Sequence, residues 1–124
     1  MNDKTNDLIE RVIGAAIEAH RHFGPGFLES TYHSALLIEL KLQGVSYRSE
    51  VAVDLDYKGH KIGQGRIDLL VEDHLVIELK STDAGPNPYK RQVLAYLKAT
   101  SLPIGLVINF GSPTLKDGIG RVRD

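Results

Sequence analysis

The fifteen residues from Arg66 to Lys80, RIDLLVEDHLVIELK, constrain the fold of this 124-residue chain more than any other stretch. Apolar and polar residues alternate on both sides of a polar break at 72–74, and a period of two is typical of β-strands. Two strands so close in sequence predict an antiparallel hairpin with a three-residue turn. The register that keeps the large apolar side chains together on one face pairs Val71 with Leu75, Leu69 with Ile77 and Ile67 with Leu79.

The same register places two acidic residues opposite each other, Asp68 facing Glu78, with Arg66 facing Lys80. Opposed carboxylates repel on a sheet, and on a partly covered face they need a shared proton, a cation partner or a metal. Lys80 follows Glu78 by two residues, so its ammonium group would lie beside the pair. A solvated strand end, where Arg66 and Lys80 simply neutralise the acids, accounts for these residues equally well, because surface ion pairs are common and weak.

Length and composition place the chain among ordinary globular proteins. Its 124 residues suffice for one core, so we expect a single domain over residues 1–124. A net charge of −1 argues against strong non-specific binding of nucleic acid by a basic surface. The absence of cysteine excludes disulfides and thiolate metal sites. A polar N-terminus and the lack of a long apolar run predict a cytoplasmic protein with no membrane partner.

Two helices are predicted before the hairpin. Apolar residues at helical spacing predict the first over residues 7–23, capped by Asn6 or Asp7 and ended by Gly24-Pro25-Gly26. On its apolar stripe lies His20, where a satisfied core histidine is more common than a ligand. The second helix is predicted over residues 28–42, with Gly44 as its C-terminal cap.

Glu29 lies in the first turn of the second helix. We expect it on the side that faces inward, which is marked by Tyr32, Ala35, Leu36, Leu40 and Gln43. The helix dipole explains a glutamate in a first turn. It does not explain why the residue lies on the inward edge.

The remaining elements predict a mixed sheet. A strand over residues 50–57 turns at Lys58-Gly59-His60 and returns into the Arg66 strand, with Gly63 and Gly65 marking a bulge or a close approach. A third helix is expected over residues 89–99, with Val93, Tyr96, Leu97 and Thr100 inward and Gln92 at the edge of that stripe. The apolar run at 104–110 predicts a central strand covered on both faces, and 116–123 a short edge strand. The order ααβββαβ(β) is that of an α/β (α+β) fold in which helices flank a mixed β-sheet.

Several sequence blocks resemble those of a known family. The segment Gly26 to Tyr32 reads G-x-x-E-x-x-Y, and further blocks are Ala16, His20 and Gly24 before it, then RID at 66–68, ELK at 78–80, QVLAYL at 92–97 and GLVINFG at 105–111. An aspartate followed by Glu-x-Lys is a weak signal alone, but all these blocks in one order are specific. On them the chain is identified as a member of the GxxExxY family, a compact branch of the PD-(D/E)xK nuclease superfamily.

The resemblance implies a restriction-endonuclease-like core and a metal-dependent nuclease that hydrolyses phosphodiester bonds in nucleic acid, with DNA favoured over RNA. Asp68, Glu78 and Glu29 would bind Mg²⁺ or Mn²⁺, which prefer oxygen ligands and acidify a bound water. Lys80 would orient or help deprotonate that water and stabilise the pentavalent phosphate. Gln92 would support the site from its helix.

This chain departs from the family pattern at two positions. Many relatives carry histidine where this chain has Tyr89, so a proton transfer or phosphate contact there would be altered. The proline that precedes the aspartate in the superfamily is replaced by Ile67, at a position that varies widely.

Two other functions stay open at the level of sequence. A catalytically silent binding or adaptor module, which could be a homo-oligomer, would keep the geometry but lack a basic groove. Such a groove would have to come from Lys61, Arg66, Lys80, Lys90, Arg91 and Lys98. A small-molecule hydrolase using the same acids would need an enclosed pocket. For the nuclease we expect Asp68, Glu78 and Lys80 to converge on one sheet face, with the Glu29 carboxylate within about 8 Å of that of Asp68.

Overall fold

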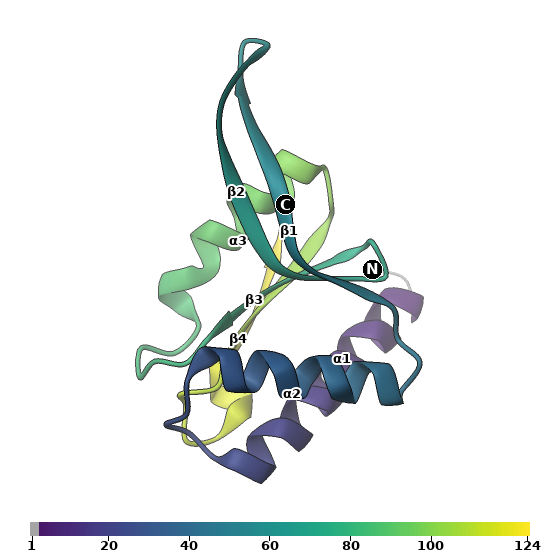
Figure 1. Cartoon of the computed structure of the whole chain (residues 1–124), viewed down its shortest axis with the longest axis vertical. Helices are drawn as coiled ribbons and strands as arrows, with labels where there is room; N and C mark the ends of the chain where they lie inside the picture. The colour runs from purple at the N-terminus through teal and green to yellow at the C-terminus, as the bar shows by residue number, and fades with distance from the viewer. Residues whose placement is uncertain (1–2) are drawn as a thin grey trace.

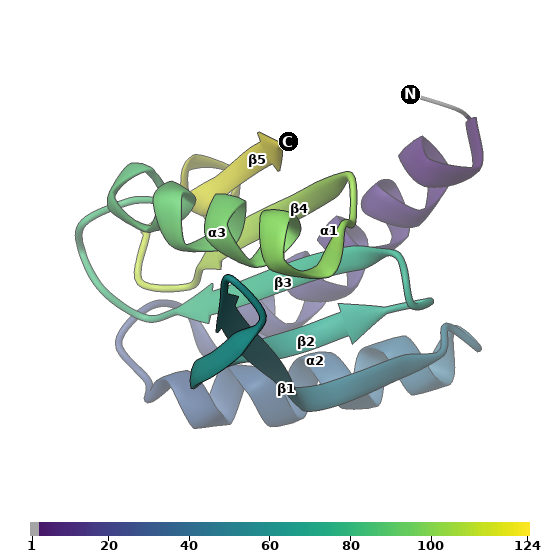
Figure 2. The same cartoon turned by 90° about the horizontal axis from the view of Figure 1, so that it is seen from above.

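The computed structural model describes residues 3–124 as one mixed sheet with helices on both faces (Figures 1 and 2). The predicted order of elements is confirmed, with the addition of two short 3₁₀ turns. The elements are α1 (Asp3–Phe23), α2 (Glu29–Leu42), β1 (Tyr47–Tyr57), β2 (His60–Val71), β3 (Leu75–Lys80), η1 (Asn87–Tyr89), α3 (Lys90–Thr100), β4 (Ile104–Asn109), η2 (Leu115–Gly118) and β5 (Ile119–Arg123).

The sheet has five strands in the order β1-β2-β3-β4-β5. All neighbouring pairs are antiparallel except β3 and β4, which are parallel. A parallel pair needs a crossover connection, and α3 supplies it. Strand β4 is buried along its whole length, as predicted for a strand covered on both faces, and β5 forms the predicted short edge strand.

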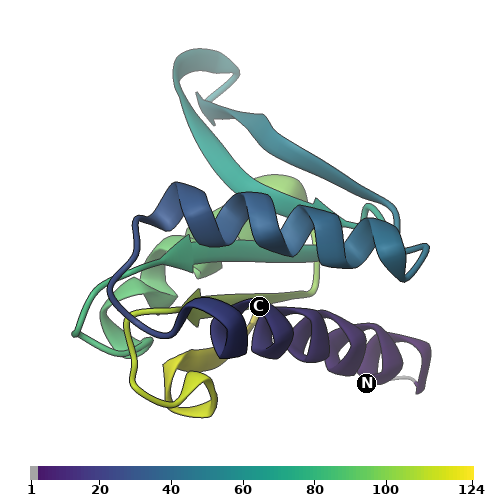
Figure 3. The same cartoon turned by 60° about the horizontal axis from the view of Figure 1, so that its bottom comes forward.

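Two apolar clusters cover the two faces of the sheet. The larger packs α1 and α2 against alternate residues of the central strands, among them Leu69, Ile77 and Leu106. The smaller packs α3 against the other face, through residues such as Val76, Val93 and Val107. Figure 3 shows α1 and α2 lying side by side on their face. The predicted alternation along β3 therefore sorts correctly between two layers of helix, and β4 is covered on both faces as its apolar run predicted.

The hairpin register is confirmed over its first three pairs, from Val71–Leu75 to Leu69–Ile77. Beyond them the strands diverge, and the Asp68 carboxylate accepts the Leu79 N–H at 2.8 Å. The prediction that Ile67 faces Leu79 is wrong, because Leu79 packs in the α1–α2 cluster and Ile67 in the α3 cluster.

The change of face in β2 coincides with an irregularity in its neighbour β1. Glu50 has a φ of 55° between the pairs Ser49–Leu69 and Val51–Ile67, and a left-handed residue bends an extended strand. Past this bend Arg66 pairs with Ala52 in the sheet and its guanidinium lies 3.6 Å from the Glu50 carboxylate. The expected position of Arg66 opposite Lys80 is therefore not adopted.

Beyond the bend, β1 and β2 continue as a two-stranded arm that projects from the body of the protein (Figure 1). Residues 54–64 of this arm are all exposed. Its turn lies at Lys58-Gly59, as predicted, with φ of 49° and 80°. The register shifts so that Ile62 is the extra residue opposite Leu55 and Asp56, next to the predicted Gly63. Gly65 marks a close approach instead, since a Cβ there would lie 2.6 Å from Cε1 of Tyr96.

The helix boundaries follow the predictions with three corrections. Helix α1 begins at Asp3, earlier than expected, and the Thr5 hydroxyl lies 3.1 Å from Nε2 of His74. Tyr89 belongs to the 3₁₀ turn η1, so α3 starts one residue later than predicted. Gln43 is exposed rather than inward, because the helix ends there. Gly44 caps α2 as predicted, with φ 72°.

His20 is a satisfied core residue, as its place on the apolar stripe favoured. Its side chain is buried, and Nε2 lies 2.9 Å from the Ser112 carbonyl oxygen. None of the helices in residues 3–124 combines the length and apolar character needed to span a bilayer.

Candidate active site

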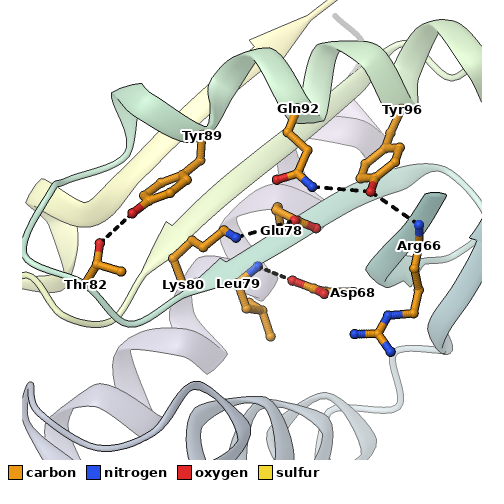
Figure 4. Close-up of polar contacts among 9 residues, drawn as sticks. All are labelled: Arg66, Asp68, Glu78, Leu79, Lys80, Thr82, Tyr89, Gln92 and Tyr96. Carbon is orange, nitrogen blue, oxygen red and sulfur yellow. Dashed lines mark hydrogen bonds and ion pairs between the residues drawn. The ribbon is translucent and has the colours of Figure 1, made fainter.

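The candidate site lies where β2 diverges from β3, between the N-terminal part of α3 and the side of the sheet covered by α2 (Figure 4). Asp68 comes from β2, and Glu78 and Lys80 come from the end of β3. Glu78 is 3% exposed, so the alternative of a solvated strand end is wrong for this residue. The β3 strand carries it inward because its neighbours on both sides, Ile77 and Leu79, are core residues of the opposite face.

The Glu78 carboxylate lacks a full set of hydrogen-bond partners among the described residues. Its Oε1 is buried and has no hydrogen-bond partner among the described residues, and its Oε2 lies 4.0 Å from Nζ of Lys80. Burial of the carboxyl group, and next the charge of Asp68, raise the pKa of Glu78 to about 8, while Lys80 acts in the opposite direction. Burial and the neighbouring acid thus make the ionised form of Glu78 costly, and a bound cation would offset that cost.

Asp68 is fixed by the backbone of the neighbouring strand. Because β2 and β3 no longer pair beyond Leu69, the N–H of Leu79 lacks a ladder partner, and the Asp68 carboxylate takes that place through Oδ2. One carboxylate oxygen is thus used for structure. The effect of its charge on the pKa of Glu78 shows that the two acids lie within electrostatic reach of each other.

Glu29 begins α2, and Tyr32 fixes the loop that leads into it. The Tyr32 side chain is buried and stacks on Phe110 with ring centroids 4.5 Å apart. Its hydroxyl donates to the Gly24 carbonyl and accepts the Phe27 N–H at 3.2 Å. Tyr32 thereby closes the turn between the two helices, which gives a physical reason for the tyrosine of the G-x-x-E-x-x-Y segment.

Glu29 itself is exposed, although it belongs to the same electrostatic neighbourhood. Partial burial of its carboxylate, and next the Asp68 charge, raise the pKa of Glu29, with Lys80, His33 and Arg66 opposing. Across residues 3–124, no three acidic or histidine side chains converge closely enough to hold a metal ion. Glu29 therefore stands near Asp68 but does not complete a ready three-ligand group with Asp68 and Glu78.

Three polar residues near the site had no role predicted from the sequence, namely Tyr96, Tyr89 and Thr82. The Tyr96 hydroxyl accepts the Arg66 N–H and one N–H of the Gln92 amide, both at 3.3 Å. Gln92 is exposed and supports the bend of β2 through Tyr96. Gly65, a predicted close approach directly before Arg66, was the signal that could have led to Tyr96. Tyr89 and Thr82 share a hydroxyl–hydroxyl bond of 2.9 Å beside Lys80.

Basic side chains do not gather around the acids. Of the six candidates, Arg66 and Lys80 lie at the site. Lys61 is on the arm, 3.4 Å from Asp54, and Lys90 packs over Gly120 of β5. The remaining two, Arg91 and Lys98, are exposed on α3.

The donor set at the site suits a hard divalent cation. Two neighbouring carboxylates, one with a buried oxygen lacking any partner in the described residues, provide the oxygen ligands that Mg²⁺ and Mn²⁺ prefer. Mg²⁺ usually keeps several waters and needs only one or two protein carboxylates. Asp68 and Glu78 therefore fit such an ion without a third protein ligand.

Comparison with known proteins identifies the fold. A crystal structure of the protein SSO0001 superposes with a TM-score of 0.58 at 24% identity, covering 77% of this chain and 49% of that one. The present chain thus spans about half the length of SSO0001 and shares its fold. No curated protein matches the sequence significantly. A sequence model of the PD-(D/E)XK nuclease superfamily matches residues 6–122, nearly the whole chain. The mixed sheet flanked by helices agrees with a restriction-endonuclease-like fold, and the protein belongs to the PD-(D/E)XK nuclease superfamily.

Proposed function

We propose that this protein is a metal-dependent nuclease of the GxxExxY branch, which hydrolyses phosphodiester bonds in nucleic acid. The observation that carries the proposal is the buried Glu78 carboxylate, with Oε1 unpartnered among the described residues, beside Asp68 and Lys80. A buried acid without a full set of partners is costly to fold, and such perturbed groups concentrate at functional sites. Superfamily membership supports nucleic acid as the substrate class.

Each residue has a role in this proposal. Asp68 and Glu78 would hold Mg²⁺ or Mn²⁺, and the bound ion would supply an acidified water and offset charge on the phosphate. Lys80 would orient the attacking water and stabilise the pentavalent phosphate as a fixed cation. Glu29 would add its carboxylate to the acidic cluster from α2, near Asp68, and Gln92 steadies the β2 bend through the Tyr96 hydroxyl. We further propose DNA rather than RNA as substrate and the cytoplasm as location.

A second candidate is a catalytically silent binding module that keeps the nuclease fold and could assemble as a homo-oligomer. The dispersed basic residues favour it, because only Arg66 and Lys80 of the six candidates lie at the acids. Phosphate-backbone contacts by lysine and arginine dominate affinity for nucleic acid. A nuclease with so few of them would bind substrate weakly and with a shallow dependence on salt.

A cleavage assay separates the two candidates. Single- and double-stranded DNA and RNA are incubated with the protein in Mg²⁺, Mn²⁺ or EDTA. We expect metal-dependent cleavage that falls on the order of 100-fold or more in Asp68→Asn and in Lys80→Met. Asp54→Asn removes a carboxylate from the arm, away from the site, and serves as the matched control. Binding without cleavage in every metal would favour the binding module instead.

A further inference from the structure

Tyr89 lies against the lysine of the candidate site. The Lys80 ammonium is over the Tyr89 ring, 5.0 Å from its centroid. An ammonium within about 6 Å of an aromatic ring is attracted by the ring's negative face. Tyr89 is half-buried and Lys80 has a side chain that is 25% exposed, so water screens this contact only in part.

The ammonium does not form a close bond with the acid beside it. Nζ of Lys80 lies 4.0 Å from Oε2 of Glu78, whereas charge-assisted N–H···O bonds are usually about 2.7–2.9 Å long. The other oxygen of Glu78 is buried and without a partner in residues 3–124. An ionised Glu78 would attract this flexible ammonium, which is carried only two residues further along the strand. The Tyr89 ring competes for the same ammonium.

The position of the Tyr89 ring is fixed from the centre of the sheet. Its hydroxyl lies 2.9 Å from the Thr82 hydroxyl. Thr82 is in turn held by Asn109, whose Oδ1 accepts the Thr82 N–H at 3.0 Å and whose Nδ2 donates to Oγ1 at 2.9 Å. Asn109 is wholly buried at the end of β4, in register with Lys80. The ring is thus tied to β4 through Thr82, which bonds Tyr89 by its hydroxyl and Asn109 by its N–H and hydroxyl.

We propose that Tyr89 is a positioning residue that holds the Lys80 ammonium off Glu78, so that the carboxylate stays free to bind a divalent cation. The role in catalysis rests on the nuclease function proposed above, but the effect on cation binding does not. Without the ring, the ammonium would close on Glu78 and compete with the cation for the same oxygen. The hydroxyl only adds to the placement of the ring by the η1 turn, so the ring face is the part that Lys80 requires.

Mn²⁺ titration calorimetry of the whole chain tests this proposal without any substrate. We expect the Kd for Mn²⁺ to rise about fivefold to tenfold in Tyr89→Leu and to change less than about twofold in Tyr89→Phe, which keeps the ring. Tyr57→Leu is the matched control, because Lys58 lies 5.4 Å from the Tyr57 ring centroid on the exposed arm. Equal Mn²⁺ affinity in wild type and Tyr89→Leu, or no Mn²⁺ binding by wild type, would overturn the proposal.

A double-mutant cycle shows whether Tyr89 acts through Lys80. In a Lys80→Met background, Tyr89→Leu should cause no further loss of Mn²⁺ affinity. An undiminished loss in that background would overturn the proposal, because Tyr89 would then act by packing alone.

Nuclear magnetic resonance provides a structural readout that applies even if a variant binds metal poorly. The ε-methylene protons of Lys80 should be shifted upfield by the ring in wild type and Tyr89→Phe, and not in Tyr89→Leu. Identical shifts in all three proteins would contradict the contact. If Mn²⁺ binding and these shifts behave as expected while no nucleic acid is cut, the nuclease function fails and the positioning role of Tyr89 stands.

Discussion

At the scale of single residues, Glu78 is a buried acid without a full set of partners in the described chain. It is buried with one oxygen unpartnered in the described chain, and its nearest cation, Lys80, stands at 4.0 Å. Burial is the main reason that its pKa rises to about 8 from 4.5, and the charge of Asp68 is the second. A group whose pKa is higher in the folded protein than in the unfolded chain makes stability depend on pH.

The first prediction at this scale concerns that pH dependence, in EDTA. Between pH 4.5 and 8 the folded protein keeps the Glu78 proton and the unfolded chain loses it, so the free energy of unfolding should fall as pH rises through this window. Glu78→Gln cannot ionise, so its stability relative to wild type should increase by about 1 to 3 kcal/mol from pH 5 to pH 8. Urea unfolding of both proteins at several pH values measures the difference. A constant difference across the window would show that Glu78 titrates normally.

At the scale of elements, the turn between α1 and α2 and the arm of β1 and β2 behave differently. The turn is held by a buried side chain, since the Tyr32 hydroxyl bonds both the Gly24 carbonyl and the Phe27 N–H. The arm is exposed over residues 54–64 on both faces and is stabilised by its own ladder and by contacts such as Lys61–Asp54. A two-stranded ribbon with no layer behind it is only marginally stable. We therefore expect substitutions at the turn to affect stability far more than substitutions on the arm.

A prediction follows for the hydroxyl of Tyr32. Tyr32→Phe keeps the stacking on Phe110 but leaves the Gly24 carbonyl and the Phe27 N–H without this partner. The free energy of unfolding should fall by about 1 to 2 kcal/mol, as for the loss of hydrogen bonds to partly buried groups. Tyr57→Phe removes an exposed hydroxyl on the arm and should change stability by less than about 0.5 kcal/mol. Equal effects of the two substitutions in urea unfolding would refute the structural role of the Tyr32 hydroxyl.

At the scale of the whole molecule, metal binding and folding stability are coupled through Asp68. A cation that binds only the folded state stabilises it by mass action. The charge of Asp68 makes the ionised form of Glu78 costly in the apo protein, and Asp68 also accepts the Leu79 N–H, a bond that an asparagine oxygen could keep. The charge of Asp68 therefore opposes folding without metal and favours it with metal.

Thermal melts of wild type and Asp68→Asn, each with EDTA and with millimolar Mg²⁺ or Mn²⁺, test this coupling. We expect Asp68→Asn to melt at the same temperature as wild type or higher in EDTA, because it loses charge and keeps shape. The upward shift that metal produces in wild type should be mostly lost in the variant. Should Asp68→Asn melt lower in EDTA while metal shifts neither protein, Asp68 serves as a plain ion-pair partner of the nearby basic residues.

Much of the fold could be predicted from sequence because the signals are local. Period-two alternation and the turn at 72–74 predicted the hairpin and its first three pairs. The cap at Gly44 and the turn at Lys58-Gly59 were also predicted, and their positive φ angles confirm both. The run at 104–110 predicted a strand buried on both faces, and β4 is one. In each case, neighbouring residues alone decide the backbone conformation or the burial pattern.

The bend in β2 could not be predicted in this way. Regular alternation placed Ile67 on the face of Leu69, but the left-handed Glu50 in β1 and the Asp68 bond to Leu79 turn the strand between them. These partners lie on two other strands, and a strand's own pattern carries no record of them. The same reason applies to Tyr96, whose hydroxyl accepts the N–H of Arg66 from a different element.

By itself, the sequence determined the order of elements, the core strands and the proximity of Asp68, Glu78 and Lys80, since adjacent strands of a hairpin bring those residues together. Only the tertiary structure decided that Glu78 is buried with an unpartnered oxygen in the described chain, that Glu29 stays exposed, and that Tyr89 lies over Lys80. The physical reason is that burial, pKa and side-chain partners depend on which helix covers which face. In this protein α2 and α3 approach the acids from opposite sides of the sheet. The residues that make these contacts are tens of positions apart in the sequence.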